Sequence, residues 1–177
     1  MTEAGRAYLW AMRGLFVALC LAVIFWRILP LSTLPAGWAG PDLIMALVFA
    51  WVLRRPAYAP ALLIALVVLL ADLMFQRPPG LWAALVVLTS EALKARAPGL
   101  RDGGFGPEWL TVGIAMCLAA LIYRLSLAIL LVPQAPLGLS LMQTALTVLC
   151  YPLVVLVSSV ALGVRKVRPS EGRRGRI

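Results

Sequence analysis

Three carboxylates in or beside apolar runs are the side chains of this sequence best placed to do chemistry: Asp42, Asp72 and Glu91. A carboxylate in hydrocarbon is costly and normally faces protein or a water-filled cavity. Arginines at comparable positions could pair with them through charge-assisted hydrogen bonds: Arg27, Arg77 and Arg124. The pattern predicts a polar feature inside a bundle of membrane helices.

These residues do not form a recognisable catalytic set. The sequence has no histidine, which excludes imidazole metal ligands, histidine general bases and histidine proton relays. Ser90 adjoins Glu91, but no histidine or lysine inside the membrane could activate its hydroxyl. Asp42 and Asp72 could approach each other as paired acids, yet neither lies in a known catalytic signature. We therefore predict that the chain is not an enzyme and has no catalytic residue, metal site or cofactor.

Composition indicates an integral membrane protein. The chain has 177 residues, of which 63% are hydrophobic and 13% charged, and its mean hydropathy is +0.97. An average soluble domain is about half apolar and a quarter charged. Cys20, Cys117 and Cys150 all lie in apolar runs, where they are expected to behave as small hydrophobic residues and not as a disulfide framework.

The fold is expected to be all-α, a compact bundle of six transmembrane helices, some short or kinked, in a single domain over 1–164. The expected spans are approximately 8–29, 38–53, 57–75, 80–93, 109–132 and 137–164. The first is interpreted as a retained anchor and not a cleaved signal peptide. The second and fourth are short enough to be re-entrant half-helices instead. Pro152 is expected to kink the last helix, and 165–177 is expected to be a basic cytoplasmic tail.

Each carboxylate has a candidate structural role. Asp42 follows Pro41 at the start of the second span, where an acidic residue complements the helix dipole, although a functional role is the alternative. Asp72 lies near the end of the third span, where the dipole disfavours a carboxylate, so Arg77 or Arg27 is expected to compensate it.

Two further ionisable side chains are expected within the membrane. Glu91 is expected at the same end of the bundle as Arg54 and Arg55. Arg124 lies within the fifth span, where it could pair with Glu91 or Asp72, or extend its charged group toward the membrane surface.

Basic residues cluster on one side of the predicted topology. Six spans place thirteen lysines and arginines on the side of the termini and only Arg27 and Arg77 on the other. The positive-inside rule therefore predicts cytoplasmic termini. The net charge of +9 lies at span ends, which favours contact with anionic lipids and argues against nucleic acid.

Several short motifs resemble MreD, a small membrane protein family of the bacterial rod-shape machinery. They are a Pro-Asp opening of the second span, a Leu-Ala-Asp-Leu end of the third, a Pro/Gly turn, and a Tyr-Pro step in the last span before a basic tail. The motif residues here are Pro41, Asp42, Asp72, Gly80 and Pro152. The similarity in size, span number and charge placement covers essentially the whole chain.

The resemblance implies a non-catalytic scaffold in the bacterial inner membrane that helps to organise lateral peptidoglycan synthesis during cell elongation. It implies direct binding to MreC, and MreB, RodA and a class B penicillin-binding protein in the wider complex. It also implies a fold similar to the substrate-binding membrane subunits of ECF transporters.

Two hypotheses follow for the polar cluster of Asp42, Asp72, Arg27 and Arg77. In a scaffold, the cluster binds a partner or simply pairs internally, and Asp72→Ala is expected to weaken association with MreC. In the alternative, a small-molecule-binding subunit of a transporter, a pocket is expected near Asp72, Arg77 and Arg27.

Overall fold

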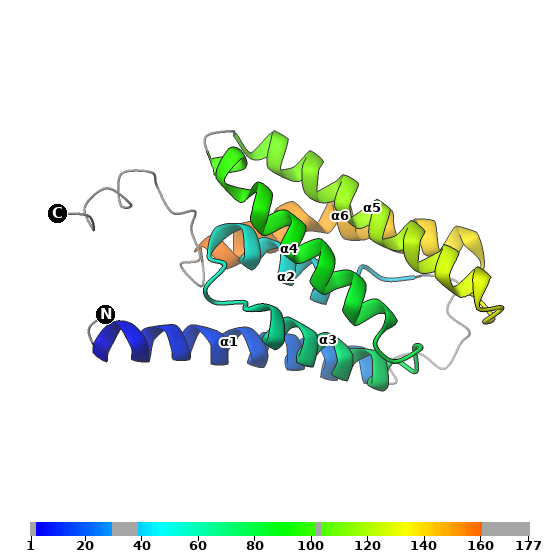
Figure 1. Ribbon diagram of the computed structural model, residues 1–177, viewed down its shortest axis with the longest axis horizontal. Helices are drawn as coiled ribbons and strands as arrows, with labels where there is room; N and C mark the ends of the chain where they lie inside the picture. The colour runs from blue at the N-terminus through cyan, green and yellow to red at the C-terminus, as the bar shows by residue number, and fades with distance from the viewer. Residues whose placement is uncertain (1–2, 30–38, 102–103, 161–177) are drawn as a thin grey trace.

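The structure is a computed structural model that describes residues 3–29, 39–101 and 104–160. These residues form six helices and no strand: α1 (Glu3–Ile28), α2 (Leu43–Arg54), α3 (Ala61–Met74), α4 (Leu81–Arg101), α5 (Phe105–Ile129) and α6 (Leu137–Val160). Consecutive helices run in alternating directions along the bundle (Figure 1). The predicted all-helical class is confirmed, while the predicted basic tail lies outside the described residues.

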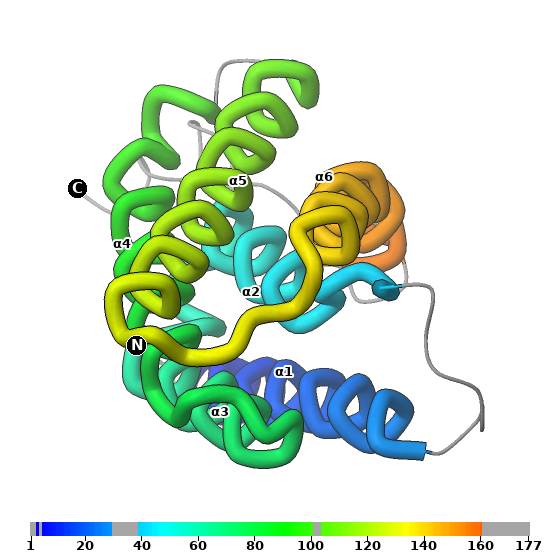
Figure 2. Tube along the Cα trace, turned by 90° about the vertical axis from the view of Figure 1, so that its right-hand side faces the viewer, coloured from blue at the N-terminus to red at the C-terminus, as the bar shows by residue number. Residues whose placement is uncertain are grey.

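Helix α2 is the centre of the bundle. Its sequence is apolar on every side, and every residue from Ile44 to Arg54 is buried. A helix that is hydrophobic all round belongs in a core, and α2 contacts α1, α4 and α6. Figure 2 shows α2 with the other helices arranged around it. Its 12 residues make a helix about 18 Å long, and the surrounding helices cover that short length.

Three helices in the described ranges are long and apolar enough to cross a membrane: Gly5–Ile28, Phe105–Ile129 and Leu137–Val160. Helices α2 and α3 are apolar but shorter, with 12 and 14 residues. Helix α4 has 21 residues, but its second half carries Glu91, Lys94 and Arg96. The three long helices are consistent with a membrane protein, and six crossings remain a prediction.

Helix α4 extends further than the sequence indicated. The fourth span was expected to end at Leu93 and the fifth to begin at Trp109, whereas α4 continues through Pro98 to Arg101. Leu93 and Ala97 are buried in the core of the bundle, and helix α4 packs against α5. Tertiary packing therefore outweighs the local preference of Pro and Gly to end a helix.

Helix α6 passes through Pro152 without interruption. A proline in a helix lacks the amide that would bond to the carbonyl four residues earlier, which here is the carbonyl of Val148. The indole Nε1–H of Trp109 on α5 donates to that oxygen over 2.9 Å. A neighbouring helix thus satisfies the carbonyl group that Pro152 leaves without its usual partner.

Candidate functional site

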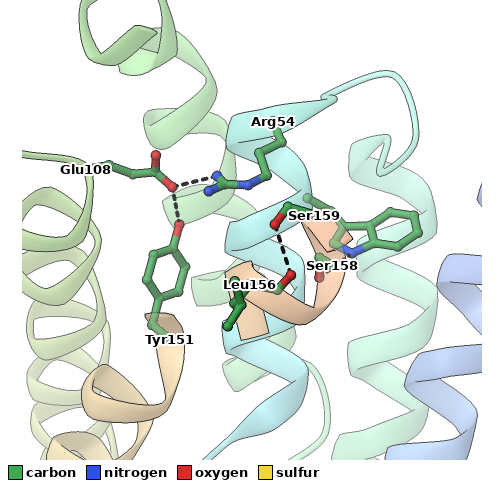
Figure 3. Close-up of polar contacts among 7 residues, drawn as sticks. Arg54, Glu108, Tyr151, Leu156, Ser158 and Ser159 are labelled. Atoms are coloured by element: carbon green, nitrogen blue, oxygen red, sulfur yellow. Dashed lines mark hydrogen bonds and ion pairs between the residues drawn. The ribbon is translucent and has the colours of Figure 1, made fainter. Parts of the chain in front are cut away.

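Two polar groups lie at opposite ends of the bundle. The first, called here the Arg54 cluster, consists of Arg54 at the end of α2, Glu108 in the first turn of α5, and Tyr151 on α6. Arg54 Nη1 contacts Glu108 Oε1 at 2.8 Å, and the Tyr151 hydroxyl donates to the same oxygen over 2.9 Å. Figure 3 shows both side chains pointing at the carboxylate from separate helices. The cluster therefore ties three helices together.

Burial makes the Arg54 cluster a closed feature. The side chains of Arg54 and Glu108 are 8% and 0% exposed, and Tyr151 is fully buried. A buried ion pair costs desolvation energy, and that cost is offset only when good geometry and further hydrogen bonds accompany it. The hydrogen bond from Tyr151 and the short contact with Arg54, both at Glu108 Oε1, offset part of that cost.

Sequence reasoning missed Glu108, because the fifth span was expected to start one residue later, at Trp109. Helix α5 begins at Phe105 and includes Glu108. A signal was available, since Pro107-Glu108 repeats the Pro-acid pattern of Pro41-Asp42 that marks a helix start.

Glu91 is not part of the Arg54 cluster. Its carboxylate contacts Lys94 Nζ on the same helix at 2.7 Å, and the Glu91 side chain is 48% exposed. The carboxylate that contacts Arg54 belongs to Glu108, and the placement of Glu91 within a membrane stays a prediction.

In the described residues, backbone amides bind the Asp72 carboxylate directly, and no arginine forms an ion pair with it. The amides of Gly80 and Ala83 donate to Asp72 Oδ2 over 3.2 and 3.1 Å. Gly80 precedes the first residue of α4 and has no side chain to cap that helix, so the carboxylate of α3 supplies the missing acceptor. The positive dipole end of α4 then stabilises the negative charge. No ion pair in the described ranges includes Asp72, but the positive charge of Arg77 also stabilises this carboxylate. The expected compensation therefore holds for Arg77 as a charge interaction over a longer distance.

The turn that follows Asp72 fixes this geometry. The amide of Arg77 donates to the carbonyl of Asp72 over 2.9 Å, and that of Gln76 to Leu73 over 3.3 Å. This pair of bonds is the Schellman pattern, in which the residue after the helix cap adopts a left-handed conformation; Gln76 has φ 54°. The backbone of Asp72 thus takes part in the cap at the end of α3, and its side chain caps the start of α4.

Asp42 caps α2, as its position after Pro41 indicated. Its Oδ1 accepts from the amide of Met45 over 3.1 Å, and its own amide donates to the Thr147 hydroxyl of α6 over 2.8 Å. Its Oδ2 lies 3.5 Å from Nη1 of Arg77, so two members of the predicted polar cluster do meet.

Arg27 joins this group through an aromatic ring. The guanidinium carbons of Arg27 and Arg77 lie 5.2 and 5.4 Å from the centroid of the Phe75 ring, within the range of cation–π attraction. Arg77 also lies 5.6 Å from the Trp82 ring.

A cavity of about 380 Å³ opens at this end of the bundle. Its polar lining comes from α2, α5, α6 and the turns beside them: Asp42, Gln76, Arg77, Tyr123, Arg124, Gln134, Ser140, Gln143, Thr144 and Thr147. Asp72 and Arg27, which the transporter hypothesis placed at a pocket, do not line it. Arg124 does, although the sequence did not associate it with Arg77.

Arg124 has only neutral partners among the described residues. Its Nη1 donates to the carbonyl of Ala135 over 3.1 Å and to the hydroxyl of Ser140. Of the alternatives left open by the sequence, an ion pair with Glu91 or Asp72 is therefore not the one that the described residues form. Arg124 lies five residues before the end of α5 and therefore close to the α5–α6 turn, where it stabilises that turn.

The described residues contain no group of three His, Cys, Asp or Glu side chains that could hold a metal ion. Cys20, Cys117 and Cys150 are all free, in agreement with their assignment as small hydrophobic residues. Comparison of the chain with protein-family models, curated proteins and solved structures gives no match.

Proposed function

We propose that the chain is a non-catalytic membrane scaffold subunit of the bacterial rod-shape machinery, as its resemblance to MreD implies. In this role it crosses the inner membrane six times with both termini in the cytoplasm. It binds a membrane-spanning helix of MreC and helps to organise lateral peptidoglycan synthesis with MreB, RodA and a class B penicillin-binding protein.

The observation that carries this proposal is an apolar groove along the exposed side of α5. The groove encloses about 450 Å³ and is lined by Trp109, Leu110, Gly113, Ile114, Cys117, Leu118, Leu121 and Val148. Small residues at a helix interface let a second helix approach closely, and association in lipid depends on such van der Waals packing. Gly113 and Cys117 provide that low relief between large side chains such as Leu110, Ile114 and Leu118, each more than half exposed.

A fixed platform supports this groove. The Arg54 cluster joins α5 to α2 and α6, and Trp109 at the start of the groove is held by its bond to the Val148 carbonyl. A Cβ at Gly113 would lie 3.3 Å from Val148 Cγ1, so α5 and α6 pack closely there. Because Asp42 and Asp72 are used within the bundle, the proposed partner surface lies on α5 and not on these carboxylates.

The proposed surface can be tested with a variant that fills the groove with a large side chain. Cys117→Trp is expected to reduce the MreC recovered with the tagged protein from its native membrane in mild detergent. Ala145→Trp is the matched control, because Ala145 is also a small exposed residue on a long apolar helix but lies outside the groove. Equal recovery of MreC with both variants and the wild type would contradict the proposed surface.

A second candidate function, a small-molecule-binding subunit of a transporter, is favoured by the cavity at the Arg77 end. Its size falls in the range of small-molecule sites, and it combines apolar walls with a few polar groups. The same purification distinguishes the two candidates, since a transporter subunit would recover an ATPase pair and a coupling membrane protein in place of MreC.

A further inference from the structure

The cavity at the Arg77 end carries more positive than negative charge. Its lining contains one carboxylate, Asp42, and two guanidinium groups, Arg77 and Arg124. Asp42 lies beside Arg77 and also caps α2. Arg124 is left with a carbonyl and a hydroxyl as partners in the described part of the chain. A charged side chain within a membrane helix is normally paired with an opposite charge or with backbone carbonyls. An anion bound in this cavity would balance the positive charge of Arg124.

The remaining walls indicate what the anion is attached to. Met116 and Leu127 of α5 and Val132 of the α5–α6 turn line the cavity with apolar atoms, and so do the rings of Trp82 and Tyr123. Those two rings pack edge to face with centroids 5.1 Å apart, so this wall is held in place. The cavity volume of about 380 Å³ exceeds that of a single phosphate or carboxylate group. The ligand therefore combines a negative group with an apolar part.

The position of the two arginines favours phosphate. Arg77 lies in the turn between α3 and α4, and Arg124 is five residues from the end of α5, about 8 Å along a helix. In a helix that crosses a bilayer centrally, the backbone there lies a few ångströms inside the edge of the hydrocarbon layer. A long arginine side chain can extend from that depth to the lipid phosphates. The planar guanidinium fork matches phosphate oxygens, and basic pockets between membrane helices bind lipid head groups.

We propose that this cavity binds a phosphate group with an apolar substituent, in which Arg124 and Arg77 donate hydrogen bonds to the phosphate oxygens. The phosphate could belong to a membrane lipid or to a phosphorylated small molecule from solution. The site goes beyond the scaffold function and does not depend on it, because its residues are separate from the groove on α5.

The test measures binding of defined probes to the purified full-length protein in detergent by native mass spectrometry. The probes are dioleoylphosphatidylglycerol, which carries a phosphate, dioleoylglycerol, which lacks one, and glycerol 3-phosphate, which lacks acyl chains. Arg124→Gln keeps hydrogen-bonding groups for Ser140 and Ala135 but removes the charge. Loss of a charge-assisted contact is expected to weaken phosphate binding about tenfold or more. Arg96→Gln removes the same charge from an exposed site on α4 and is expected to bind like the wild type.

The probes also separate the two sources of phosphate. If dioleoylphosphatidylglycerol binds tightly and Arg124→Gln weakens that binding, a lipid ligand is supported. If glycerol 3-phosphate also binds and Arg124→Gln weakens its binding by the same factor, a soluble ligand is supported. If Arg124→Gln fails to fold, Arg77→Gln provides the same comparison. Unchanged phosphate binding in a folded variant, or dioleoylglycerol binding as tight as that of the phospholipid, would overturn the proposal.

Discussion

The two ends of the bundle use the same residue types to opposite effect. At one end, Arg54 meets a carboxylate and a tyrosine in a closed cluster, with side chains at most 8% exposed. At the other, Arg77 lies beside Asp42, Arg124 has only neutral partners among the described residues, and both arginines border an open cavity. Buried charges that satisfy one another hold helices together, whereas an unbalanced set leaves a place for a ligand. The difference lies in the number of partners and in the packing around them.

The largest loss of stability is expected when the Arg54 cluster is disrupted. Glu108→Ala removes the carboxylate that Arg54 and Tyr151 contact and leaves a buried guanidinium without it. Breaking a buried pair in this way costs about 3–5 kcal/mol of stability, measurable as a large drop in the thermal unfolding midpoint in detergent. Tyr151→Phe, which removes one hydrogen bond, is expected to cost only about 1 kcal/mol. A smaller loss for Glu108→Ala than for Tyr151→Phe would contradict the role given to the Arg54 cluster.

Asp72 gives the next largest effect. Asp72→Ala removes the acceptor for two amides at the start of α4 and is expected to cost about 2 kcal/mol, while Asp72→Asn keeps an oxygen there and costs less. Thermal unfolding of both variants checks this order. Because Asp72 lies away from the proposed partner surface, the amount of MreC recovered with each variant should be proportional to the amount of variant that is folded. A folded Asp72→Ala variant that selectively loses MreC would instead restore Asp72 as a partner contact.

A smaller loss of stability is expected for Asp42→Asn, at the end of the bundle that contains the cavity. Asp42→Asn keeps an oxygen for the Met45 amide but removes the negative charge beside Arg77. Stability is expected to fall by about 1 kcal/mol, because a charge-assisted contact of a buried carboxylate is weakened. Phosphatidylglycerol should bind several-fold more tightly, because the cavity gains net positive charge. Native mass spectrometry reports the affinity. Weaker binding would show that Asp42 is needed to orient Arg77.

The smallest effect is expected for the exposed pair on α4. Glu91 and Lys94 form an ion pair three residues apart, and such pairs contribute only about 0.2–0.5 kcal/mol. Glu91→Ala should therefore shift the unfolding midpoint very little. A loss comparable to that of Asp72→Ala would mean that Glu91 has a buried partner after all.

The helical segments could be predicted because each is marked by its own residues. Apolar runs of sufficient length indicated α1, α5 and α6, and Pro41 with Asp42 indicated the start of α2, where Asp42 is indeed the N-cap. The end of α4 could not be predicted, because Pro98 and Gly99 favour a loop locally and only the burial of Leu93 and Ala97 against other helices keeps the helix intact.

The partners of the charged residues could not be predicted, because they are distant in sequence or are not side chains. Glu108 is 54 residues from Arg54, and no local pattern connects them. Asp72 bonds to amides, which every residue except proline possesses, so composition cannot reveal it. The cavity depends on how α5 and its following turn fold back toward α2, which brings Arg124 near Asp42 and Arg77.

The contrast between the two ends can be measured directly with two cysteines on α6. In a background with Cys20, Cys117 and Cys150 replaced by alanine, Thr144→Cys places a thiol in the cavity, and Ser158→Cys places one beside buried Trp51. The rates of reaction with a sulfonate-bearing and a trimethylammonium-bearing methanethiosulfonate are compared in nanodiscs. An open, positively charged cavity predicts that Thr144→Cys reacts faster with the sulfonate reagent, whereas Ser158→Cys reacts slowly with both. Equal protection of the two thiols, or faster reaction of Thr144→Cys with the cationic reagent, would contradict this account.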